Sequence, residues 1–232
     1  MEDAVRDSTR ARIVRTAADL LTHGGRKAVT TRAVAAAAGV QAPTIYRLLG
    51  DKVGLLDAVA DHGFQAYLTQ KGARPAGGDP VDDLRAGWDL HVGFGLANPA
   101  LYALMYGDPR PGPPPQAAAR AMTMLRALVR RIAEAGRLRI GEEQAVHLVH
   151  AMACGTVLTL LAMAERDPTL SDLARDAALA AVIADAPAVA TPGPVGAAVA
   201  LRAVLTDTDV VTNGERALLG EWLDRIAAAG TR

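Results

Sequence analysis

Hydroxyl, amide and cationic side chains recur over residues 30–52, where they could bind the phosphates and base edges of a nucleic acid. Thr30 and Thr31 fall at an expected helix start, where hydroxyls and free backbone N–H groups favour a phosphate. Gln41 and Arg47 are flexible enough to approach base edges, and Tyr46 can donate its hydroxyl to a phosphate. The residues predicted to contact DNA are Thr30, Thr31, Arg32, Gln41, Ala42, Thr44, Tyr46, Arg47 and Lys52.

Two short helices separated by a glycine turn would position these side chains. Thr30 can cap the first helix, residues 33–38 propagate it with little bulk, and Gly39 supplies the positive φ at which it ends. The second helix should run from about Ala42 to Leu49, with Pro43 in its first turn, where a missing N–H does no harm. This order is typical of a helix-turn-helix, whose second helix enters the DNA major groove.

Positive charge is concentrated around the same segment, although the whole chain has 25 basic and 25 acidic residues. Between Ser8 and Leu56, eight lysines and arginines oppose two aspartates, which gives this part a net charge of +6. The remainder must therefore carry about −6. Such an asymmetry predicts a DNA-binding domain joined to a domain that does not bind DNA.

The segment from Arg10 to Leu56 resembles the tetracycline-repressor (TetR) family of bacterial transcription regulators. The resemblance is carried by an amphipathic helix ending at Gly24-Gly25, then VTTRAVAAAAGV from Val29, and then PTIYRLLGDKVGLL from Pro43. It implies an all-helical homodimer whose N-terminal domains bind a palindromic double-stranded operator. It also implies that the C-terminal domains bind a small-molecule effector.

Three positions depart from that family pattern. Gln41 stands where serine is common, and Leu48 and Leu49 stand where a His-Phe pair is common. Loss of the serine removes a helix cap, whereas a glutamine could read adenine. We interpret the two leucines as packing residues. The operator sequence is therefore not transferable from relatives.

Composition predicts an all-α protein of 232 residues, because aromatics are only 3% and the apolar volume comes mainly from Ala, Leu and Val. We expect an N-terminal three-helix helix-turn-helix domain over 1–52, followed by a larger helical effector-binding and dimerisation domain over 53–232. Proline and glycine favour breaks at 72–80, 107–115 and 187–194. Periodicity predicts further helices over 9–22, 52–70, 81–97, a short stretch after Asn98-Pro99, 116–135, 142–166, 170–184, 195–205 and 213–229.

Aromatic, histidine and methionine side chains in the second domain could line an effector cavity. Such a lining suits a small, largely apolar molecule. The alternative is that each is an ordinary core residue, and Trp88 needs a partner for its N–H if it is buried. The residues predicted to bind the ligand are Trp88, His91, Phe94, Tyr102, Met105, Met122 and His150.

His147, His150 and Cys154 share one helical face and are all potential ligands of a soft metal ion. Three ligands on one helix span about 10 Å, which is too long for a single ion without flanking ligands. We therefore predict no metal site and no cofactor. The histidines are expected to be hydrogen-bonded in a pocket or at a dimer face, beside a buried, inert thiol.

The sequence lacks a nucleophile elbow, a phosphate-cradling loop and a paired metal motif, so no catalytic residue and no enzyme activity is predicted. A helical small-molecule-binding protein or enzyme with a vestigial DNA-binding head remains an alternative, as does an activator or a regulator without effector. The charged N-terminus and single cysteine favour the cytoplasm, and residues 146–164 are interpreted as a buried helix, with no membrane partner. Dimer pairing is expected through 142–166 and 213–229.

Overall fold

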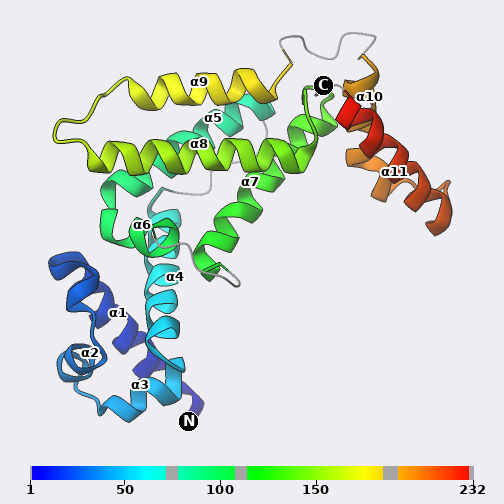
Figure 1. The fold of residues 1–232 in the computed structure, drawn as a ribbon. Helices are drawn as coiled ribbons and strands as arrows, with labels where there is room; N and C mark the ends of the chain where they lie inside the picture. The colour runs from blue at the N-terminus through cyan, green and yellow to red at the C-terminus, as the bar shows by residue number, and fades with distance from the viewer. Residues whose placement is uncertain (1, 72–77, 108–113, 185–192, 230–232) are drawn as a thin grey trace. The chain divides into compact units, whose positions relative to one another are not determined.

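The computed structural model describes residues 2–71, 78–107, 114–184 and 193–229, which are mostly α-helical (Figure 1). Among these residues, an isolated antiparallel bridge between Leu138 and Ile183 is the one β-type pairing. The prediction of an all-α protein is confirmed. The helices are α1 (Glu2–Ala28), α2 (Thr31–Ala38), α3 (Ala42–Leu49), α4 (Lys52–Lys71), α5 (Pro80–Ala97), α6 (Pro99–Tyr106), α7 (Gln116–Glu134), α8 (Glu142–Ala162), α9 (Leu170–Val182), α10 (Pro194–Val204), the 3-10 helix η1 (Leu205–Asp207) and α11 (Asn213–Ala229).

Two of the predicted helices had wrong boundaries. The first helix begins at Glu2 instead of Thr9 and continues to Ala28, but Gly25 interrupts it with a non-helical backbone (φ 65°, ψ −172°). Glycine adopts this positive φ without strain, so the chain bends there before a further turn forms. The helix predicted to reach Arg166 ends at Ala162, because Met163 has extended backbone. Most of the predicted breaks fall on 72–77, 108–113 and 185–192, outside the described residues.

Close contacts divide the chain into two compact units, which are described separately. The first unit comprises residues 1–75 and 93–121, and the second comprises residues 76–92 and 122–232. Helices α5 and α7 each contribute residues to both. The functional division into 1–52 and 53–232 remains a prediction.

The first unit holds α1 to α4 around an apolar core. Each of the four helices supplies side chains that are almost completely buried, and these helices pack on one another. Burial of an apolar side chain is the main stabilising contribution to such short helices, which are marginal in isolation. The core residues are Ile13 and Ala17 of α1, Val34 of α2, Ile45 of α3, and Leu55 and Val59 of α4.

The same unit also contains an aromatic cluster formed by Phe64, Tyr67, Phe94, Tyr102 and Tyr106. The ring centroid of Phe94 lies 5.4, 4.9 and 6.3 Å from those of Phe64, Tyr67 and Tyr102. Tyr102 in turn lies 4.7 Å from Tyr106, and all these ring pairs are tilted or edge-on. These five residues belong to a chain with only two Phe, four Tyr and two Trp. Burial raises the pKa of Tyr67. Most of the chain's aromatic volume is therefore used in this one core.

In the second unit, ion pairs hold the start of α5 against the end of α7. Arg137 donates from Nη1 to both carboxylate oxygens of Asp79 at 2.7 Å, and Arg131 pairs with Asp83. Asp79 also accepts the backbone N–H of Val81 at 2.8 Å, so it caps α5. The Arg137 guanidinium, followed by this N–H, lowers the pKa of Asp79.

Helix α9 is joined to α5 by polar contacts and lies along α8 (Figure 1). Trp88 Nε1 donates to Ser171 Oγ at 3.2 Å, and Arg175 pairs with Asp89 at 2.8 Å. By length and composition alone α8 could cross a membrane, but a core helix meets the same criteria. Its residues Val146, Val149, Val157 and Leu160 are among those buried, which agrees with its interpretation as a core helix.

The last two helices form a hairpin within the second unit. Helices α10 and α11 pack chiefly on each other, around a small core of Ala198, Leu205 and Leu223 with Leu219 against it. Arg216 secures the connection by donating to the carbonyl oxygens of residues 206 and 208 at 2.6 and 2.9 Å. The bounds of α11 agree with the sequence prediction.

Candidate nucleic-acid interface

Thr30 begins the first helix of the predicted DNA-binding motif. Its Oγ1 accepts the backbone N–H of Ala33 at 3.1 Å, as expected of an N-cap. The helix ends at Gly39, which has left-handed backbone (φ 63°, ψ 40°), and Val40 N–H donates to the carbonyl of Ala35 at 3.0 Å. The predicted cap and glycine turn are both confirmed.

The second helix, α3, has the predicted bounds and Pro43 in its first turn. Gln41 occupies the N-cap position with extended backbone, and its side chain makes no capping hydrogen bond. Ile45 is 1% exposed and is the buried residue that attaches this helix to the core. The opposite side of α3 is therefore available to solvent.

Asp51 fixes the start of α4 and so positions Lys52. Its Oδ1 accepts the backbone N–H of Gly54 at 2.8 Å, and its carbonyl accepts that of Leu55 at 3.0 Å. Lys52 is exposed in the first turn of the helix. Sequence analysis had not singled out Asp51, although a carboxylate three residues before a free helix N–H is a recognisable cap.

The side chains predicted to contact DNA are mostly exposed. Tyr46 exposes 50% of its surface although it neighbours the buried Ile45. Leu48 and Leu49 are half-buried, consistent with packing residues. The exposed members of the predicted set are Thr30, Arg32, Gln41, Tyr46, Arg47 and Lys52, and the half-buried members are Thr31, Ala42 and Thr44.

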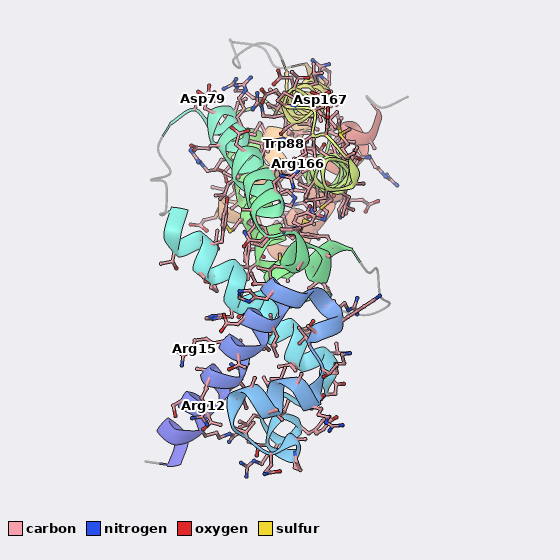
Figure 2. All side chains as sticks on the ribbon, turned by 90° about the vertical axis from the view of Figure 1, so that its left-hand side faces the viewer. Arg12, Arg15, Asp79, Trp88, Arg166 and Asp167 are labelled. Atoms are coloured by element: carbon pink, nitrogen blue, oxygen red, sulfur yellow. The ribbon has the colours of Figure 1, made fainter. Side chains whose placement is uncertain are left out.

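Helix α1 adds cations to the same unit. Arg10, Arg12 and Arg15 are exposed, and Figure 2 shows Arg12 and Arg15 pointing outward from the helix. Arg26 and Lys27 follow the interruption at the end of α1 and are exposed as well. This distribution places the predicted positive charge on the surface, where it can attract phosphates.

The residues predicted to bind an effector are divided between the two units. Trp88, His91, Met122 and His150 belong to the second unit, while Phe94, Tyr102 and Met105 belong to the first. The latter three are at most 6% exposed. Trp88 is 4% exposed, and Ser171 accepts its indole N–H, the partner that the sequence analysis required. Packing therefore accounts for these four, and ligand binding by the seven remains a prediction.

The three potential metal ligands of α8, His147, His150 and Cys154, do not form one site. His147 is 67% exposed and lies 3.8 Å from the carboxylate of Glu143, whereas His150 and Cys154 lie together. His91 of α5 joins them, 63 residues away in sequence. No sequence pattern had indicated that contact. Among the described residues, no group of three or more His, Cys, Asp or Glu side chains is arranged to hold a metal ion.

Comparison with known proteins agrees with this geometry. Residues 13–59 match the family model described as bacterial regulatory proteins, tetR family, which spans α2, α3 and parts of α1 and α4. No curated protein sequence matches the chain.

Solved structures assigned to the same family share the fold. A protein from Shewanella sp. PV-4 aligns with a TM-score of 0.59 at 19% identity, covering 76% of this chain and 98% of that one. A regulator from Agrobacterium tumefaciens gives 0.52 at 23% identity, covering 76% and 95%. One from Streptomyces coelicolor A3(2) gives 0.51 at 23% identity, covering 95% and 97%.

Proposed function

We propose that this chain, whose residues 13–59 match the tetR family of bacterial regulatory proteins, is a ligand-responsive transcriptional repressor of that family. It binds a palindromic operator as a homodimer in the cytoplasm and is released by a small, largely apolar effector. The observation that carries the DNA-binding role is the exposed polar and cationic face of α3, held from behind by the buried Ile45.

In this proposal α3 enters the major groove. Gln41 and Arg47 approach base edges, while Tyr46 and Lys52 bind phosphates on either side. The N-terminus of α2 offers free backbone N–H groups and the Thr31 hydroxyl to a further phosphate. Gln41 supports direct reading of a base because its side chain is exposed and makes no capping hydrogen bond.

Replacing Arg47 or Lys52 with alanine should weaken DNA binding in two distinguishable ways. The operator would first be selected from a random-sequence duplex library with the purified protein. Arg47→Ala should lose about 1–3 kcal/mol of binding free energy on that operator and relax the sequence preference of the protein. Lys52→Ala should weaken binding to all duplexes and reduce the slope of log affinity against log salt concentration by about 1. Fluorescence anisotropy across a salt series measures both effects.

Arg85→Ala is the matched control, because Arg85 is an exposed arginine of the second unit that pairs with Asp82 within its own helix. It should leave the affinity unchanged. Selection of no duplex at low salt by the wild-type protein would contradict the DNA-binding role and favour a helical carrier or enzyme with a vestigial DNA-binding head.

Exposed apolar side chains support dimerisation through α8 and α11. Leu218, Trp222 and Ile226 recur every four residues along α11 and are 47%, 51% and 42% exposed. On α8, the separate side chains of Leu148 and Leu158 are 37% and 41% exposed. An exposed apolar row such as that of α11 is typical of a protein interface. A two-fold dimer would present its recognition helices about 34–36 Å apart, or at a related spacing, to two half-sites.

Trp222→Glu should dissociate the dimer. A buried tryptophan at an interface is worth at least about 2 kcal/mol, which corresponds to a rise in the dimer dissociation constant of about 30-fold or more. Sedimentation velocity over a concentration series measures this constant. Val210→Glu is the control, because Val210 is 89% exposed and lies outside both helices; equal dissociation of both variants would count against the proposed interface.

Effector release requires that the ligand bind the DNA-incompetent state more tightly than the DNA-bound one. We assign the effector contacts first to His91, His150 and Met122, because these predicted residues of the second unit are half-buried rather than fully packed. A thermal-shift screen would find ligands, since binding to the native state raises its stability. The proposal includes no catalytic step.

A further inference from the structure

A thiol and two imidazoles from two helices meet in the second unit, and we call them the thiol–imidazole cluster. Cys154, the only cysteine of the chain, has its Sγ 3.6 Å from both Nδ1 and Nε2 of His150. His91 of α5 places its Nε2 3.9 Å from the same sulfur. The two ring centroids are 6.4 Å apart, with the rings inclined at 73°.

The thiol–imidazole cluster is only partly buried. Cys154 and His150 are half-buried, whereas Ala153 and Val157 beside them on α8 are buried. A purely structural cysteine is usually enclosed by apolar side chains and is inert, while reactive cysteines are partly accessible. Cys154 is thus half-buried, which corrects the prediction of a buried thiol, and we expect a small molecule to reach it.

Burial disfavours the protonated, charged form of both imidazoles. Burial, with a smaller contribution from His150, lowers the pKa of His91 to about 4. Burial, with a smaller contribution from His147, also lowers the pKa of His150. A neutral imidazole has one unprotonated nitrogen, which can accept a proton. His91, with its pKa of about 4, is too weak a base to take the thiol proton. His150, 3.6 Å from the sulfur, is therefore the imidazole placed to accept it.

We propose that the thiol–imidazole cluster is a covalent regulatory site, where Cys154 adds to a small α,β-unsaturated carbonyl compound while His150 accepts the thiol proton. The sulfur forms a bond to the β-carbon, and the electron pair of the carbon–carbon double bond moves to give the enolate. The proton then passes from His150 to the α-carbon. This addition has no leaving group and needs no oxidant. Oxidation to an intrachain disulfide, by contrast, would require a second cysteine, which this chain does not have.

The position of the thiol–imidazole cluster suggests how an adduct could change DNA binding. His91 lies on α5 just before this helix passes from the second unit into the first. Because His91 lies 3.9 Å from the sulfur, we expect an adduct on Cys154 to displace α5 relative to α8. This consequence rests on the proposed DNA-binding function, whereas the chemical reactivity of the cluster does not.

The test uses N-ethylmaleimide, an α,β-unsaturated carbonyl compound, with the full-length protein. Intact mass spectrometry should find one adduct per wild-type subunit and none on Cys154→Ser. His150→Gln should slow the reaction about tenfold at neutral pH, because a positioned proton acceptor is lost. His62→Gln is the matched control: His62 is an exposed histidine of α4 in the first unit, so this variant should react at the rate of the wild type. Circular dichroism verifies that each variant is folded.

Operator binding provides the second measurement. Modified wild-type protein should bind the operator at least about tenfold more weakly, a typical allosteric coupling, and treated Cys154→Ser should bind as before. Equal rates for wild type, His150→Gln and free cysteine would overturn the inference, as would full operator affinity of the modified protein. Failure of the unmodified protein to bind any DNA would instead refute the proposed function, and the rates alone would then decide whether the cluster is reactive.

Discussion

Replacing Ile45 with alanine is expected to destabilise the helix-turn-helix by about 2–5 kcal/mol, the usual cost of truncating a fully buried isoleucine. Ile45 is 1% exposed and is the buried side chain of an eight-residue helix. A helix this short has little stability of its own, so its conformation depends on that attachment. Operator binding should be lost together with the order of α3. Hydrogen–deuterium exchange of residues 42–49 and urea unfolding followed by circular dichroism measure the two effects.

The neighbouring variant Tyr46→Ala separates loss of structure from loss of a DNA contact. Tyr46 is 50% exposed, so its replacement should change the unfolding free energy by no more than about 0.5 kcal/mol. It should nevertheless weaken DNA binding, because the proposed phosphate contact is removed. Unchanged exchange of residues 42–49 in Ile45→Ala would refute the claim that core packing holds the recognition helix.

Acidification should destabilise the second unit between pH 6.5 and pH 4. Burial lowers the pKa of His91 from 6.5 to about 4 in the folded protein. Above pH 6.5 the side chain is neutral in both states, and below it only the unfolded chain takes up the proton, so the unfolding free energy falls as the pH falls. The full loss, reached near pH 4, is on the order of 3 kcal/mol. His150, whose pKa is also lowered, acts in the same direction.

Tryptophan fluorescence during urea unfolding reports this effect, because Trp88 and Trp222 both belong to the second unit. His91→Gln supplies the control: it cannot titrate, so its unfolding free energy should depend less steeply on pH in this window. Subtracting the unfolding free energies of the two proteins at each pH removes the contribution of the carboxylates that both contain. These include Glu143 and Asp79, whose pKa values are lowered. Parallel pH profiles would show that His91 is not kept neutral by the fold.

The DNA-binding motif was predictable because its determinants are local. A cap, a positive-φ glycine and a proline in a first turn act over at most one helical turn, so they can be identified without knowledge of the fold. Thr30, Gly39 and α3 accordingly lie where the sequence analysis placed them. The start of α1 was missed because its charged residues carry no apolar periodicity, although they are compatible with a helix.

The surroundings of the residues proposed to bind an effector were much less predictable. His91 and Phe94 are one helical turn apart on α5, yet they belong to different units. Phe94 packs in the aromatic cluster, whereas His91 contacts the thiol of Cys154. Aromatic and histidine side chains serve equally well in a core or a binding site, so residue type alone did not distinguish these roles.

The sequence by itself determined the helical class, the helix-turn-helix and the positive charge around it, because each depends on composition or on residues within one or two turns. Only the tertiary structure decided that Ser171 satisfies Trp88 and that His91 meets Cys154, 63 residues away. Periodicity predicts which face of a helix is apolar, but it does not specify which other helix will cover that face. Contacts between distant helices depend on how their side chains pack together, and the chemistry of this second unit depends on those contacts.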